Sequence, residues 1–237
     1  MDLKLPARNP DGTLELVTTR LELTAKPRHP KGSISGRTLA LVHAKRFPLH
    51  LYRYLYDTVG SPYLWWERRE MSDDELSAIV HDERVELHLL QVDGVPAGFA
   101  ELDRRQPGEV ELSYFGLVPE YLGHGLGLHF LGRVVELAWQ DDDVERVVVH
   151  ACSTDHPRAL LVYQRIGFTA FDEVRETIED PRDRGLFPEH DDDTAANAGP
   201  VPEPVPLRGP GPVPVPDAEP DPDSDPDSDS DSNPDRE

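Results

Sequence analysis

The segment Leu117-Val-Pro-Glu-Tyr-Leu-Gly-His-Gly-Leu-Gly127 lies between a predicted strand and a predicted helix, and most of the fold prediction follows from it. Glycines at positions 123, 125 and 127 allow tight turns in which backbone amides point into one concavity. The start of the following helix adds the positive end of its dipole. Such a turn suits a pyrophosphate group, so the segment predicts a site for a phosphorylated ligand.

The sequence on either side of this segment predicts a mixed domain. Asp93-Gly94 fits a two-residue hairpin turn, and the stretch from Ser72 to Glu75 has the spacing of a capping box. Hydrophobic periodicity predicts strands at residues 18–25, 38–45, 85–92, 95–103, 109–118, 146–151 and 168–178, and helices at residues 48–60, 73–81, 128–139 and 157–166. This order predicts an α/β (α+β) fold, with a central, mostly antiparallel mixed sheet flanked by helices.

The charge of the chain is concentrated at its C-terminal end. The 237 residues carry a formal net charge of −22, and residues 191–237 hold 14 of the 46 acidic residues, 12 of the 24 prolines and only two arginines. Such a segment cannot bury enough apolar surface to fold, so we predict a disordered Pro/Asp/Ser-rich acidic tail at residues 189–237. The rest suffices for one core, and we predict a flexible arm at residues 1–17 and one domain at residues 18–188.

Composition also argues against several classes of protein. No apolar run approaches the roughly 20 residues of a membrane helix, and no signal-peptide core follows Met1, so a soluble, cytoplasmic protein without a membrane partner is expected. His150, Cys152 and Asp155 lack a second pair of ligands, so no metal is expected. The excess of negative charge argues against binding to nucleic acid. Because Cys152 is the only cysteine, an intrachain disulfide is excluded.

A second segment, Asp155-His-Pro-Arg-Ala-Leu-Leu-Val-Tyr-Gln-Arg-Ile-Gly-Phe168, follows after one more strand. Together the two segments resemble the GNAT superfamily of acyl-CoA-dependent N-acyltransferases. The first is similar to the family's coenzyme-A loop. The usual pattern of this loop is Gln or Arg, then any two residues, Gly, any one residue, and Gly or Ala. The second, with Tyr163 and Gly167-Phe168, is similar to a later family motif. Leu122 replaces the usual Gln or Arg, which affects cofactor affinity more than cofactor identity.

The resemblance implies a site for acetyl-CoA. The pantetheine arm would pair with backbone near Leu117, and Tyr163 falls where the family commonly has the general acid that protonates the CoA thiolate. Packing of Tyr163 in the core is the alternative. The pyrophosphate would lie on the backbone amides of Gly123, His124, Gly125, Leu126 and Gly127.

The amine substrate also needs a base, because an alkyl ammonium with a pKa of about 10.4 is almost fully protonated at pH 7. The resemblance places Glu111 at the position of the glutamate base in the histone acetyltransferase branch. Glu101, on the neighbouring strand, is expected to face the same cleft. The alternative is that both glutamates are exposed carboxylates on strands, without a catalytic role. The aromatic residues between positions 52 and 66 are interpreted either as contacts to the acceptor or as core.

We therefore expect an N-acetyltransferase that transfers acetyl from acetyl-CoA directly to a primary amine, which is a small molecule, a peptide N-terminus or a lysine. A monomer and a homodimer both remain open. One alternative is a non-catalytic acyl-CoA sensor or interaction module of the same fold. Another is a Rossmann dinucleotide site, which the residues disfavour because Leu128 interrupts the glycine fingerprint and the expected acidic residue is missing.

Overall fold

The computed structural model describes residues 6–27 and 36–187, and the predicted tail at residues 189–237 lies outside the described residues. The described strands are β1 (Thr13–Leu23), β2 (Leu39–His43), β3 (Val85–Val92), β4 (Val95–Asp103), β5 (Glu109–Leu117), β6 (Arg146–Cys152) and β7 (Thr169–Glu179). The helices are α1 (Leu49–Gly60), α2 (Glu67–Glu70), α3 (Asp73–Val80), α4 (Leu126–Ala138) and α5 (Ala159–Ile166). Three 3₁₀ turns join them, η1 (Ser61–Tyr63), η2 (Pro119–Tyr121) and η3 (Pro181–Arg184).

Local sequence signals account for several of these boundaries. The Ser72 hydroxyl accepts a hydrogen bond from the Glu75 amide, and the Glu75 carboxylate accepts one from the Ser72 amide, so the predicted capping box starts α3. Asp93 and Gly94 have φ angles of +52° and +84°, as a type I′ hairpin turn between β3 and β4 requires.

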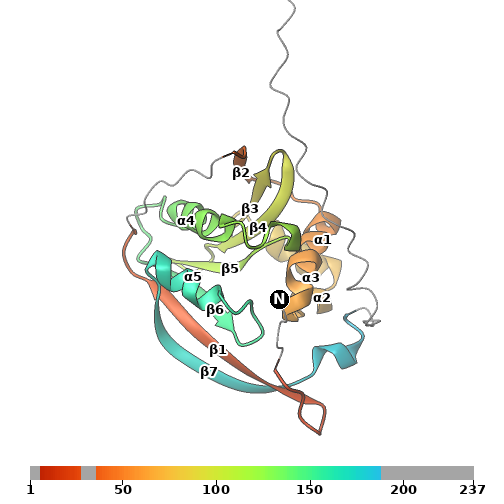
Figure 1. Cartoon of the computed structure of the whole chain (residues 1–237). Helices are drawn as coiled ribbons and strands as arrows, with labels where there is room; N and C mark the ends of the chain where they lie inside the picture. Colours follow the sequence, from red (N-terminus) through yellow and green to blue (C-terminus); the bar gives the residue numbers. More distant parts are fainter. Residues whose placement is uncertain (1–5, 28–35, 188–237) are drawn as a thin grey trace, which may run out of the picture. The chain divides into compact units, whose positions relative to one another are not determined.

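The sheet has the strand order β2-β3-β4-β5-β6-β1-β7. Neighbouring strands run antiparallel except β5 and β6, which run parallel. The predicted class, a mostly antiparallel mixed sheet flanked by helices, is therefore confirmed (Figure 1).

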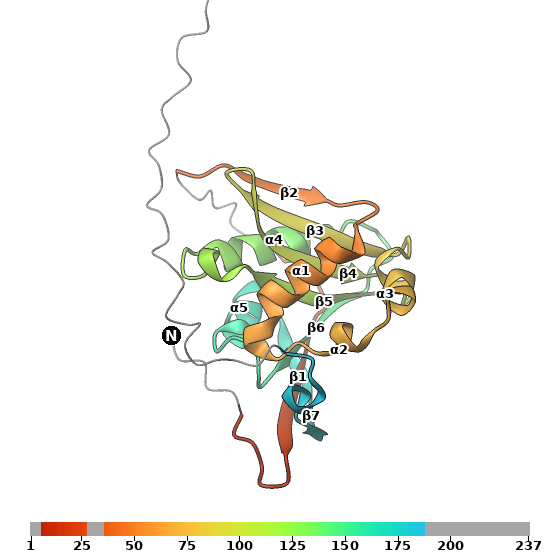
Figure 2. The ribbon, with the colours of Figure 1, turned by 90° about the vertical axis from the view of Figure 1, so that its right-hand side faces the viewer.

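Two hydrophobic clusters cover the two faces of this sheet. In one, Phe130 of α4 and Tyr163 of α5 pack with the strands. In the other, Tyr52 of α1 and Leu76 of α3 pack against Phe99 of β4. Figures 1 and 2 show the same division, with α4 and α5 on one side of the sheet and α1 to α3 on the other. The sheet thus lies between two helical layers.

Strand β1 lies between the two last strands of the domain. It pairs with β6 on one side and with β7 on the other, and within the described residues β7 has no other strand partner. Residues 13–17, predicted to be part of a flexible arm, are instead the first half of β1 and face residues 175–179. Alternation over residues 18–25 indicated the strand, and its earlier start was missed although Thr13-Leu-Glu-Leu16 also alternates polar and apolar residues.

Candidate active site

Strands β5 and β6 lie side by side only where they begin. Residues 109–112 pair with residues 146–149, and beyond this point the two strands separate. A bulge leaves Ser113 without a partner on β4 at the place of separation. Because residues 114–117 remain paired with β4 alone, their other backbone edge faces the gap. Such an edge can hydrogen-bond an extended ligand.

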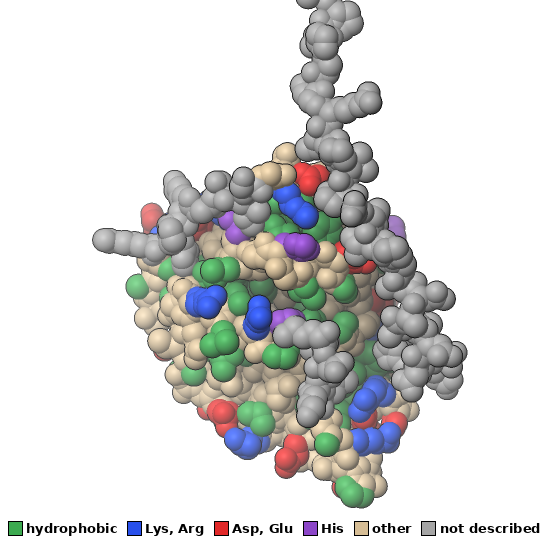
Figure 3. Space-filling model, viewed as in Figure 1, with side chains coloured by type: hydrophobic (Ala, Val, Ile, Leu, Met, Phe, Trp, Pro, Cys, Tyr) green, Lys and Arg blue, Asp and Glu red, His purple; other side chains and the backbone are tan. Residues whose placement is uncertain are grey.

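The gap opens into a cavity of about 1180 Å³. Its lining comes from β1, β5, β6 and β7, from the glycine loop before α4, from α5 and from the connection between α1 and α2. On the face shown in Figure 3, basic and histidine side chains lie among hydrophobic ones near the middle, and acidic side chains lie nearer the edges. A cavity of this size can hold an elongated, cofactor-sized ligand.

The glycine loop forms one end of the cavity. Gly123 and Gly125 have φ angles of +82° and +75°, which favour glycine, and Gly125 directly precedes α4. The backbone N–H groups of residues 123–127 donate to no described residue. They are therefore free to bind an anion at the positive end of the α4 dipole.

The residues predicted to bind cofactor lie close together in the fold but differ in their access to the cavity. Leu117, Gly123, Gly125 and Gly127 line it. His124 is exposed outside the lining, whereas the Leu126 side chain is fully buried in the core.

Tyr163 reaches the cavity from the opposite side, on α5. Its side chain is largely buried against Phe168 and Phe115, and it lines the cavity. Burial, together with the nearby charge of Asp155, holds the pKa of the Tyr163 phenol well above its ordinary value. The phenol therefore keeps its proton at neutral pH.

Glu111 lines the same cavity from β5. The Glu111 Oε1 atom lies 3.7 Å from Nδ1 of His150 on β6, which is too long for a hydrogen bond but short enough for electrostatic attraction. Burial raises the pKa of the Glu111 carboxyl, and a charge on His150 opposes this effect.

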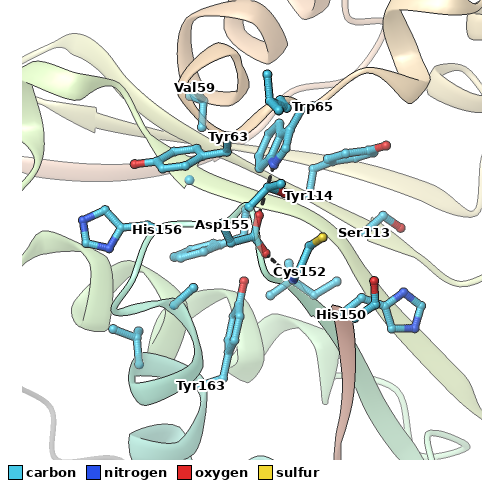
Figure 4. Close-up of a pocket in the computed structure, with 18 of the residues that line it drawn as sticks. Val59, Tyr63, Trp65, Ser113, Tyr114, His150, Cys152, Asp155, His156 and Tyr163 are labelled. Atoms are coloured by element: carbon cyan, nitrogen blue, oxygen red, sulfur yellow. Dashed lines mark hydrogen bonds between the residues drawn. The ribbon is translucent and has the colours of Figure 1, made fainter. Parts of the chain in front are cut away.

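Asp155 was not among the catalytic residues predicted from the sequence. It lies in the turn between β6 and α5, where its Oδ2 atom accepts a hydrogen bond of 2.7 Å from the Cys152 amide. Figure 4 shows its carboxylate between Trp65 above and Tyr163 below. Burial raises the pKa of Asp155 to about 6, against the lowering effects of the Cys152 amide and the Trp65 indole. No local sequence pattern predicts this environment of Asp155, because Trp65 is 90 residues away.

Aromatic side chains form the wall opposite Tyr163. Trp65 packs with its ring centroid 5.1 Å from that of Tyr114 and 5.4 Å from that of Tyr56. Tyr63, Trp65, Trp66 and Tyr114 line the cavity, whereas Tyr52 and Tyr56 are fully buried. The aromatic residues between positions 52 and 66 are therefore divided between cavity wall and core, except Tyr54, which is exposed and lies outside the lining.

A sequence model of the acetyltransferase (GNAT) family matches residues 52–168. The chain carries a GNAT-family domain. The match contains the glycine loop and the segment around Tyr163, and it excludes both β1 and β7.

Solved structures share the fold of this GNAT domain. A GCN5-related N-acetyltransferase from Sphaerobacter thermophilus has 16% identity and a TM-score of 0.51, with 70% of this chain and 51% of that chain covered. A functionally unknown conserved protein from Staphylococcus epidermidis (17%, TM-score 0.49, 72% and 64%) and a GCN5-related N-acetyltransferase from Kribbella flavida (18%, TM-score 0.46, 72% and 60%) are also similar. The chain thus spans 64% and 60% of the lengths of the latter two proteins. No curated protein matches the sequence.

The GNAT domain departs from its family loop at Leu122, and basic residues lie nearby. The Leu122 side chain lines the cavity and is 37% exposed. Arg158 and Arg165, next to and within α5, line the same cavity and form no ion pair with any described residue. They offer the positive charge that Leu122 lacks.

Glu101, predicted to face the cleft of the GNAT domain, lies outside the cavity lining. Its side chain is fully buried, with Oε1 2.7 Å from Nη2 of Arg68 and Oε2 2.6 Å from the hydroxyl of Tyr52. Arg68 Nε also donates to the Tyr52 hydroxyl at 3.3 Å. Both carboxylate oxygens are thus engaged in a buried ion pair that joins α2, α1 and β4.

Replacing Glu101 with glutamine is expected to lower the free energy of unfolding by about 3 kcal/mol, because it leaves the Arg68 cation buried without a counter-ion. Urea denaturation measures the change. Glu173→Gln is the matched control, since the pair of Glu173 and Arg175 is exposed and should contribute at most about 1 kcal/mol. Equal effects of the two substitutions would contradict the assigned role of Glu101.

Two absences hold for residues 6–27 and 36–187 of the chain. No group of three or more His, Cys, Asp or Glu side chains in these ranges is arranged to hold a metal ion. None of their helices is both long and apolar enough to span a membrane.

Proposed function

We propose that the protein is an N-acetyltransferase that transfers acetyl from acetyl-CoA directly to a primary amine. One observation carries this proposal: a single cavity connects the unpartnered amides of residues 123–127 with the Tyr163 phenol through the gap between β5 and β6. A ligand with phosphates at one end and a thioester at the other matches this arrangement.

The residues present suit acetyl-CoA along its whole length. The amides of Gly123 to Gly127 and the α4 dipole would hold the pyrophosphate, and Arg158 and Arg165 would neutralise further phosphate charge. The free edge of β5 ending at Leu117 would pair with the amides of the pantetheine arm. When bound, acetyl-CoA supplies the activated acetyl group.

Tyr163 is proposed as the proton donor to the departing sulfur. Because its pKa is raised, the phenol holds its proton until a strong base develops nearby, as the thiolate does when the carbon–sulfur bond breaks. Glu111 is the base proposed from the sequence for the amine, and its raised pKa brings it closer to the range in which a carboxylate is an effective base. Glu101 has no part in this scheme, because Arg68 and Tyr52 occupy its carboxylate.

Acetyl-CoA is expected to raise the melting temperature of the protein, because a ligand that binds only the folded state stabilises it. A shift of several degrees is expected for a domain of this size when acetyl-CoA exceeds its Kd by about 100-fold. NAD serves as the control, since it shares the adenine and pyrophosphate groups but lacks the pantetheine arm and should produce no comparable shift.

A thiol-release assay with a broad panel of primary amines completes the test. Release of CoA that depends on an amine supports the transferase. A melting shift without thiol release for any amine would instead favour the non-catalytic acyl-CoA-binding module, with which Leu122 is compatible. No shift at millimolar acetyl-CoA would contradict the cofactor assignment.

A further inference from the structure

Asp155 is held in place by its own turn. Its backbone N–H donates to the Cys152 carbonyl at 2.9 Å, and the Cys152 N–H donates to Asp155 Oδ2 at 2.7 Å. This reciprocal pair fixes the carboxylate at the end of β6, where β5 and β6 have already separated. A carboxylate restrained in this way is preorganised for a ligand in the gap.

The Asp155 carboxylate has no cationic partner among the described residues. Its Oδ1 atom has one contact of 3.5 Å to the Trp65 indole N–H, which is a weak hydrogen bond, and among the described residues it forms no ion pair. The groups that face or adjoin it are Glu67 of α2, Tyr63 of η1, Tyr163 of α5, Cys152 and His156. A partly buried carboxylate with only a neutral histidine, phenols and another acid around it favours a cationic ligand.

The same carboxylate lies beside the flat walls of the cavity. Trp65 contacts it directly, and the charge of Asp155 contributes to the raised pKa of Tyr63 and of Tyr163. In Figure 4 the Tyr163 hydroxyl points toward Asp155, while Tyr63 and Trp65 lie on the other side of the carboxylate. Aromatic faces attract both a cation and a flat apolar group.

We infer that Asp155 binds the ammonium group of the acceptor and takes its first proton, and that the acceptor carries its primary amine on an aromatic or other flat apolar group. This inference rests on the proposed transferase function and names the substrate class of that same site. It makes Asp155 a catalytic residue, which touches the reacting nitrogen.

The reaction balances with these groups. The ammonium gives one proton to the Asp155 carboxylate, and the nitrogen lone pair forms a bond to the acetyl carbon as the carbon–sulfur bond breaks. Sulfur takes the proton of Tyr163, and the nitrogen returns its second proton to Tyr163 as the amide forms. Asp155 then releases its proton to solvent, so one ammonium and one thioester give one amide, one thiol and one proton.

Two observations favour Asp155 over Glu111 for the first proton. The His150 imidazole lies 3.7 Å from Glu111 and compensates part of its charge when protonated, whereas Asp155 forms no ion pair with any described residue. Asp155 also acts electrostatically on Tyr163, and Glu111 does not contribute to the raised pKa of Tyr163. The group that takes the first proton, Asp155, therefore lies beside Tyr163, the group that donates a proton to sulfur.

The pH dependence of kcat/KM with phenethylamine tests the assignment. For the unaltered protein, kcat/KM should be nearly level between pH 7 and 9, because the carboxylate is ionised above its pKa of about 6 and binds the ammonium form. Asp155→Asn should lower kcat/KM by about 100-fold at pH 7 and restore about tenfold per pH unit, because only the neutral amine then reacts. A level profile for Asp155→Asn would overturn the inference, as would a profile in which only Glu111→Gln produces the slope.

Binding and stability measurements separate this inference from the proposed function. Calorimetric titration of phenethylamine with CoA present should show binding to the unaltered protein and at least tenfold weaker binding to Asp155→Asn, and phenethyl alcohol is the uncharged control. Absent or equal binding of phenethylamine would overturn the inference, whereas a melting shift with acetyl-CoA would still support the cofactor site. Folding raises the pKa of Asp155 from 3.8 to about 6, so its ionisation removes stability as the pH rises between these two values. Asp155→Asn should therefore melt higher than the unaltered protein at pH 8 and not at pH 4. No such difference would show that the carboxylate is not buried as described.

Discussion

A protein that lacks residues 1–25 is expected to lose cooperative folding, although the family match begins only at residue 52. Leu14 and Leu21 of β1 are fully buried, and β1 supplies the strand partner of β7 and one partner of β6. Without β1, two strand edges and the apolar surface beneath them would face solvent. The domain would then lose a large share of its core together with the part of the cavity lining that β1 supplies.

Far-ultraviolet circular dichroism during thermal unfolding measures the effect of this truncation. The control is removal of residues 191–237, the predicted tail, which should leave both folding and acetyl-CoA binding intact. A truncated chain starting at residue 26 that still unfolds in one sharp transition at an unchanged temperature would contradict the role given to β1.

Replacing Tyr163 with phenylalanine is expected to lower kcat by about 10²- to 10⁴-fold while the Kd for acetyl-CoA stays nearly constant, because the substitution removes only the proton donor. The aromatic ring keeps its contacts with Phe115 and Phe168. The Tyr163 hydroxyl donates no hydrogen bond to a described residue, so the free energy of unfolding should change by less than about 1 kcal/mol.

Thiol release at saturating substrate gives kcat, and calorimetry gives the Kd for acetyl-CoA. Tyr54→Phe is the matched control, because Tyr54 is 60% exposed on α1 and lies outside the cavity lining. If Tyr163→Phe lowers kcat no more than Tyr54→Phe does, Tyr163 is part of the core and not of the mechanism.

Most of the element order is predictable from the sequence because its signals are local. The glycine loop, the capping box and the Asp93-Gly94 turn depend on residues within a few positions of each other, and each occurs where it was expected. Hydrophobic periodicity likewise places the central strands β3 to β6 to within a residue of their observed bounds.

The features that the sequence did not predict depend on contacts between distant segments. The position of β1 is a matter of pairing across more than a hundred residues, which no local pattern encodes. Glu101 lies on the expected strand, but its partner Arg68 is 33 residues away. The sequence therefore predicted neither the ion pair of Glu101 nor its position outside the cavity lining. Asp155 gains its environment from Trp65 in the same way.

The pairing of β1 also has a consequence for biosynthesis. Thr18 of β1 lies opposite Cys152 of β6, and Thr13 lies opposite Glu179 of β7. Strand β1 therefore has neither of its described strand partners until nearly the whole domain has been made. At about 5–20 residues per second, the interval is on the order of ten seconds or more, during which an unpaired strand with buried-type leucines is open to chaperones and to other nascent chains.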